Sequence, residues 1–174
     1  MPSERLNMRS LAQRLEQLEG ERAVRACIAR YMQLCDELGP GSELTELAQL
    51  FTEDVVWEGV GDRYRDLFGC VQGRDAVLTM FAKYTRAPAH FRINAHFLSS
   101  ERIAGGEGGY AQGTWTMLQT SSFADGKSYL AAARLQVDFR AEGSHWRIAH
   151  FRTASLFSRP VTRWDGEVPM PVPR

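Results

Sequence analysis

Apolar and polar residues alternate along residues 89–100, Ala-His-Phe-Arg-Ile-Asn-Ala-His-Phe-Leu-Ser-Ser. A period of two is typical of a β-strand, because successive side chains of a strand point to opposite faces of the sheet. One face would be apolar and the other polar: Phe91, Ile93, Ala95 and Phe97 against His90, Arg92, Asn94 and His96. The polar face predicts a strand that borders either bulk water or a polar cavity.

Apolar residues recur at intervals of three and four in the first half of the chain, which predicts helices. The predicted helices cover Ser10–Leu38, a segment capped by Ser42, and Arg74 to about Thr85. Gly20 indicates a junction between a short helix and a longer one, and Gly39-Pro40-Gly41 ends the first helical region. A short strand is expected at residues 55–60 and a loop at 61–73.

The second half of the chain is rich in long alternating segments joined by turn sequences, which predicts an antiparallel meander. Its strands are expected at 110–123, 128–140 and 145–158, with turns at Asp125-Gly126 and Glu142-Gly143. Helices followed by long hairpins predict an α+β fold, a curved antiparallel sheet wrapped around the N-terminal helices as a cone with an internal cavity. The expected organisation is a flexible N-terminus (1–9), one domain (10–158) and a Pro-rich extended tail (159–174).

Charge and cysteine content narrow the classes of function. The 174 residues carry 21 Lys+Arg and 21 Asp+Glu, so no net field favours nucleic acid or an anionic membrane. Cys27, Cys35 and Cys70 form no C-x-x-C, and Cys27 and Cys35 lie roughly 12 Å apart along a helix, too far for a disulfide. No segment has the length of a membrane span. These features favour a soluble protein of the cytoplasm, a reducing compartment.

The residues offer no metal or cofactor motif. His90 and His96 lie six positions apart on one strand, hence roughly 20 Å apart, and cannot share an ion. The Gly105–Gly109 run joins two strands instead of a strand and a helix, so it is not a phosphate-binding loop. We therefore expect no metal and no cofactor.

Several stretches together resemble a known family. They are Ala23-Val24-Arg25, Tyr31, Asp36, Leu47-Ala48, Leu50 to Val55, Gly73 to Val77, His90, Asn94 and Trp146-Arg147-Ile148. With this order of elements, the chain resembles the nuclear transport factor 2-like (cystatin-like cone) superfamily, and within it the SnoaL-like group, from about residue 20 to 157. It is similar to scytalone dehydratase, hexachlorocyclohexane dehydrochlorinase and bile-acid 7α-dehydratase of that superfamily.

The resemblance implies a His–Asp pair inside the cone. It places Asp36 as the group that orients His90, which would act as general base, and it places Tyr31 and Arg152 as electrophilic helpers. A carboxylate bound to one ring nitrogen suits an imidazole for proton abstraction near neutral pH. Two alternatives stay open: Asp36 as a solvated acid near a helix end, and Tyr31 as a core aromatic. On an unbroken helix these two side chains point roughly 140° apart.

The expected substrate-binding residues are Trp57, Phe68, Phe81, Asn94, Trp115 and His150, although large aromatic residues are also typical of a core. The resemblance implies a cofactor-independent lyase or isomerase that acts on a hydrophobic, ring-containing small molecule. The alternative is a non-catalytic ligand-binding or structural subunit, similar to the β subunit of ring-hydroxylating dioxygenases.

An apolar face on the outside of the sheet would mark a subunit interface. The residues expected on it are Phe91, Ile93, Phe97, Phe151 and Phe157. We therefore expect a homodimer or homotrimer.

Overall fold

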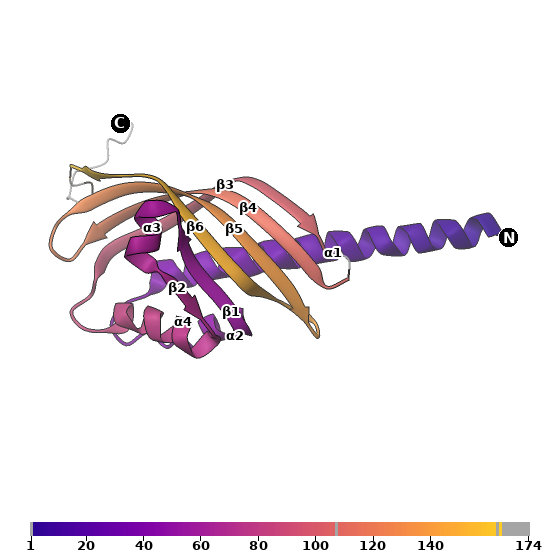
Figure 1. The fold of residues 1–174 in the computed structure, drawn as a ribbon, viewed down its shortest axis with the longest axis horizontal. Coiled ribbons are helices and arrows are strands. Elements are labelled where there is room, and N and C mark those ends of the chain that lie inside the picture. The colour runs from indigo at the N-terminus through magenta and orange to yellow at the C-terminus, as the bar shows by residue number, and fades with distance from the viewer. Residues whose placement is uncertain (1, 107, 163, 165–174) are drawn as a thin grey trace, which may run out of the picture.

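A six-stranded sheet curves over one long helix, and three shorter helices lie toward the C-terminal end of that helix (Figure 1). The computed structural model describes residues 2–106, 108–162 and 164. The elements follow the order α1 (Pro2–Glu37), α2 (Thr45–Gln49), β1 (Phe51–Val60), α3 (Gly61–Phe68), β2 (Cys70–Gln72), α4 (Arg74–Phe81), the 3₁₀ helix η1 (Ala82–Thr85), β3 (Phe91–Gly105), β4 (Tyr110–Phe123), β5 (Ser128–Glu142) and β6 (His145–Val161). The expected α+β class is confirmed.

The strands lie in the order β2-β1-β6-β5-β4-β3, and the sheet does not close. The β3-β4-β5-β6 meander is antiparallel throughout, as its turn sequences predict. The sheet is not wholly antiparallel, however, because β1 pairs with β6 in parallel. This parallel pair joins the first strand of the chain to the last and brings the first half of the chain against the meander.

Helix α1 is continuous through Gly20, where the sequence predicts a junction. At this point the helix crosses the turn between β3 and β4 so closely that a Cβ on Gly20 would lie 2.9 Å from the Cα of Gly106. Gly20 therefore permits a close backbone crossing and does not break the helix. Helix α1 begins at Pro2, within the segment 1–9 that is expected to be a flexible N-terminus.

Two further boundaries differ from the sequence prediction. Residues 61–68, expected as a loop, form α3, which starts at a left-handed Gly61 with φ of 75°. Strand β6 continues to Val161, three residues into the expected tail, and residues 163 and 165–174 of that tail lie outside the described part of the chain. Among the described residues, no helix combines the length and apolar character that crossing a membrane requires.

A β-bulge near the start of β3 changes which side chains face inward. Phe91 pairs with Phe123 but Ile93 pairs with Ser122, so β3 has one extra residue at Arg92. Phe91 consequently lies on the same face as Asn94, because one extra residue reverses the alternation of a strand. The simple alternation predicted for residues 89–100 is correct only after the bulge.

Candidate active site

A cavity of about 330 Å³ lies between α1, the concave face of the sheet, and helices α3 and α4. The Phe, Tyr and Trp residues that line it are Tyr31, Trp57, Tyr64, Phe68, Phe81, Tyr84, Phe91 and Phe151. Trp57, Phe68 and Phe81, which the sequence analysis expects to bind substrate, lie at this cavity, and the rings of Trp57 and Phe68 meet edge to face at 5.5 Å. The walls are large, rigid and apolar, which suits a ring-shaped apolar ligand.

Asp36 and His96 form the closest polar pair at this cavity. Oδ1 of Asp36 lies 2.5 Å from Nδ1 of His96, and Oδ2 accepts the backbone N–H of His96 at 3.2 Å. The His96 side chain is only 11% exposed and that of Asp36 is 26% exposed. His96 lines the cavity, whereas Asp36 stands behind it. Because a carboxylate only accepts hydrogen bonds, Nδ1 carries a proton, and Nε2 is the ring nitrogen that has a lone pair when the imidazole is neutral.

Tyr31 and Asp36 point in different directions from α1, as an unbroken helix requires, and both still take part in the site. Helix α1 is not loosened and remains helical to Glu37. Tyr31 faces the cavity directly, while Asp36 projects sideways to β3 and contacts His96 there. The amide of Asn94 adds a second link, since its Nδ2 donates to the carbonyl oxygen of Cys35 at 3.4 Å. The end of α1 is therefore fixed to β3 by two neighbouring links, Asp36–His96 and Cys35–Asn94.

The predicted pairing of Asp36 with His90 is wrong. The His90 ring packs against Tyr84, Phe91 and Phe123, with ring centroids 5.3, 4.5 and 5.2 Å apart. His90 is also absent from the described residues that line the cavity. The physical reason is the bulge at Arg92, which separates the face of His90 from the face of Asn94 and His96.

Tyr31 is buried and its hydroxyl accepts a hydrogen bond from Nε1 of Trp57 at 3.0 Å. Burial raises the pKa of the Tyr31 hydroxyl well above its ordinary value, so Tyr31 keeps its proton. The hydroxyl also hydrogen-bonds to the Cys35 side chain, and burial raises the pKa of that thiol to about 12. Tyr31 is therefore a neutral donor at the cavity wall, oriented by the indole of Trp57.

Gln119 is a polar cavity residue that the sequence analysis missed. It faces His96 across the β3–β4 pair and lines the cavity. Its Nε2 donates to Oδ1 of Asn94 at 2.9 Å and to Oγ of Ser121 at 3.3 Å. Both amide protons are thus engaged, which leaves Oε1 as an acceptor for a ligand. The register of the predicted β-meander is the only sequence signal that would have placed Gln119 beside His96.

Arg152 and His150 do not lie in the cavity, so their expected placement there is wrong. Both stand on the opposite face of the sheet, because their neighbours Phe151 and Thr153 line the cavity and side chains alternate along β6. Arg152 donates to Asp138 at 2.8 Å and to Nδ1 of His150 at 2.6 Å, and Nε2 of His150 lies 2.7 Å from Glu58. These residues form a charged network on the outer surface of the sheet.

Trp115 also does not line the cavity, although the sequence analysis expects it to bind substrate. It is buried against Phe139 and donates from Nε1 to Glu101 at 3.1 Å, and it does not line the cavity that His96 lines. The alternative of a core aromatic therefore applies to Trp115. Glu101 also accepts from Nε of Arg25 at 2.5 Å, so this carboxylate joins α1 to the sheet.

The expected apolar outer face is smaller than the sequence indicates. Phe91 and Phe151 line the cavity, so they are not available on the outer surface. Ile93, Phe97 and Phe157 are exposed, at 45%, 56% and 40%. Among the described residues, no group of three or more His, Cys, Asp or Glu side chains has the arrangement of a metal site.

The family of the chain follows from its sequence as a whole. Residues 16–152 match the model of the SnoaL-like domain. This match spans most of the 174 residues, from the middle of α1 to β6, and includes Asp36 and His96. The protein belongs to the SnoaL-like family.

Solved structures with the same fold include enzymes. A hexachlorocyclohexane dehydrochlorinase from Novosphingobium barchaimii has 15% identity and a TM-score of 0.71, covering 90% of this chain and 99% of its own. A proposed scytalone dehydratase from Novosphingobium aromaticivorans has 17% identity and a TM-score of 0.70, covering 91% and 97%. A nuclear transport factor 2-like protein with a cystatin-like fold from the same organism has 26% identity and a TM-score of 0.59, covering 84% and 88%. None of the curated proteins compared with the chain matches it significantly.

Proposed function

We propose that this protein is a cofactor-independent lyase or isomerase that removes a proton from a carbon atom of an apolar, ring-containing small molecule. The observation that supports this most strongly is the hydrogen bond between Asp36 and His96 at the wall of an aromatic cavity. In this proposal His96 is the general base, in place of His90, and Asp36 orients its ring.

The proton transfer uses the lone pair on Nε2 of His96. A substrate C–H bond breaks, the proton moves to Nε2, and the electron pair forms a carbon–carbon double bond or an enolate. The resulting imidazolium is stabilised by the carboxylate of Asp36, which already holds Nδ1. In a lyase the neighbouring leaving group departs with its bonding electrons. In an isomerase, His96 returns the proton to another carbon.

Tyr31 is suited to stabilise negative charge on a substrate oxygen. Its hydroxyl accepts from Trp57 and keeps its own proton, which it can redirect from Cys35 to a ligand. A donor held in place before the reaction stabilises developing charge better than water does. Gln119, opposite His96, offers an acceptor for a hydroxyl or amine hydrogen of the same ligand.

The cavity sets the size and character of the substrate. About 330 Å³ is at the lower end of the volumes typical of small-molecule sites, roughly 300–1,000 Å³, which favours a compact ring system. The names of two similar structures, a dehydrochlorinase and a proposed dehydratase, both describe eliminations from small organic molecules. These names agree with the chemistry that the His96–Asp36 pair can perform.

The test is solvent-deuterium incorporation. Cyclic ketones and hydroxylated ring compounds that raise the melting temperature of the protein are incubated with it in D₂O, and exchange at carbon is followed by NMR. We expect exchange with the natural chain and none with His96→Gln, while the ligand still binds the variant. Binding with neither exchange at carbon nor an elimination product in the natural chain, for every ligand of the panel, would contradict the proposal and indicate a binding protein instead.

A further inference from the structure

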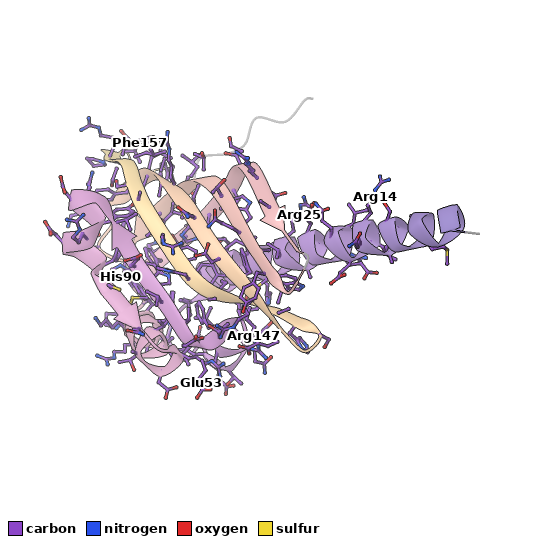
Figure 2. The ribbon with its side chains drawn as sticks, turned by 45° about the vertical axis from the view of Figure 1, so that its right-hand side comes forward. Arg14, Arg25, Glu53, His90, Arg147 and Phe157 are labelled. Carbon is purple, nitrogen blue, oxygen red and sulfur yellow. The ribbon has the colours of Figure 1, made fainter. Side chains whose placement is uncertain are left out.

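The first part of α1, residues 2–19, is called the arm below; it extends beyond the sheet, and only its last turn, at Gln17, passes next to Gly106 of the β3–β4 turn (Figure 1). At 1.5 Å per residue the arm is about 27 Å long. Arg14 lies on this extended part, whereas Arg25 lies where the helix passes beneath the sheet (Figure 2). Every side chain described in the arm, at position 8 and at positions 10–19, is exposed. A helix of this length is only marginally stable in water without a packing partner.

The arm carries an apolar stripe with nothing packed on it. Met8, Leu11, Leu15 and Leu18 are 71%, 63%, 55% and 61% exposed. Their spacing of three, four and three residues is that of the a and d positions of a coiled coil. This spacing places all four side chains along one line of the helix surface.

The described part of the domain lies on the other side of the helix from this stripe. At about 100° per residue, the centre of the stripe lies roughly 150° around the helix from the face of Val24, Ile28 and Tyr31. Those three residues are buried beneath the sheet. The stripe therefore points away from the chain's own sheet, and no described residue of the chain covers it.

Charges beside the stripe are complementary to a second copy of the arm. With Leu11 and Leu15 at d and a, Arg14 takes the g position and Glu19 the following e position. In a parallel pair of helices, each g residue faces the e residue of the next heptad on the other helix, so Arg14 faces the partner's Glu19. An antiparallel pair would instead bring the two Arg14 side chains together.

The stripe ends where the arm joins the domain. The next two positions in the same series are Arg22 and Arg25, and Arg25 is held by Glu101 of β3 at 2.5 Å. Pairing of this helix with a second helix is therefore confined to residues 2–19. About two heptads form a short coiled coil, so the association should depend on protein concentration.

We propose that the arm forms a parallel two-stranded coiled coil with the arm of a second copy of this chain. Sedimentation velocity of the full chain over a wide concentration range tests this directly. We expect monomer and dimer in equilibrium for the natural chain. Leu15→Glu buries a charge in the interface and should raise the dimer dissociation constant by about tenfold or more. Ser10→Glu adds the same charge away from the stripe and should leave the constant unchanged.

A charge-reversal cycle tests the parallel arrangement. Arg14→Glu and Glu19→Arg should each weaken the dimer, and the double variant should restore it, because the ion pair is then present in reverse. A monomer at every concentration would contradict the proposal. So would a dimer that Leu15→Glu weakens no more than Ser10→Glu does, or a double variant that stays as weak as the single ones. Circular dichroism of each variant shows that the domain remains folded.

Discussion

Nδ1 of His96 lies 2.5 Å from Oδ1 of Asp36, although the two residues are 60 positions apart in the sequence. The other carboxylate oxygen of Asp36 accepts the backbone N–H of the same histidine. One carboxylate therefore fixes both the ring and the backbone of His96. This arrangement keeps Nε2 free on the cavity side, where a substrate would lie.

Replacing Asp36 with asparagine should lower kcat without weakening ligand binding in the cavity. The side-chain amide that this substitution introduces can donate to Nδ1 of His96, which would favour the tautomer with its proton on Nε2 and remove the base. We expect kcat to fall by about 10²- to 10⁴-fold, with ligand affinity nearly unchanged. Glu37→Gln, at the exposed neighbouring position, is the control. A kcat of Asp36→Asn equal to that of this control would show that the carboxylate does not assist His96.

The sequence predicts much of this fold because its periods are long and regular. The meander strands follow from alternation and turn residues, and α1 follows from the stripe that includes Val24, Ile28 and Tyr31. The identity of the histidine beside Asp36 could not be predicted in this way. His90 and His96 share a face in an ideal strand, and the single extra residue at Arg92 separates them. A bulge of this kind depends on tertiary packing and has no fixed residue pattern.

Gly20→Ala should destabilise the protein even though alanine favours helices. Its Cβ would lie 2.9 Å from the Cα of Gly106 and 3.3 Å from the Trp146 ring, so the helix and the β3–β4 turn must move apart. We expect a loss of about 1–3 kcal/mol in the free energy of unfolding. Gly39→Ala has open space around it and is the matched control. Urea unfolding of both variants distinguishes this crossing from a general effect of removing glycine.

Glu101→Ala should cost more stability than the loss of an ordinary surface ion pair. Trp115 is 3% exposed and its Nε1 would lose its hydrogen-bond acceptor, which typically costs about 1–3 kcal/mol. Glu46→Ala breaks a comparable contact with Arg30 on the exposed surface and should have little effect. Equal unfolding midpoints in urea for the two variants would argue against this role of Glu101.

The three cysteines should differ sharply in reactivity. Burial raises the pKa of the thiols of Cys27 and Cys35 to about 12, so both stay protonated below that pH, and the thiolate is the reactive form. Cys70 is exposed. Treating the folded protein with iodoacetamide at about pH 8, near the ordinary cysteine pKa, should label Cys70 alone. Mass spectrometry counts the labels, and rapid modification of Cys35 in the native state would contradict the structure.

The positions of Arg152 and Trp115 show a second limit of sequence reasoning. The alternation along β6 correctly groups His150 with Arg152, but it does not tell which face is inside. That choice depends on the pairing of β6 with β1 and β5, which places Phe151 and Thr153 toward α1. Four polar groups then satisfy one another on the outer face, since Arg152 and His150 meet Asp138 and Glu58 there.

The most direct measurement compares His96→Gln with His90→Gln in the same proton-exchange assay. Both substitutions replace an imidazole on or beside β3 with a neutral amide, so each controls for the other. The account predicts that His96→Gln abolishes carbon-proton exchange while it still binds the ligand, and that His90→Gln keeps a rate within a few-fold of the natural chain. Full activity in His96→Gln, with the loss found in His90→Gln instead, would contradict it.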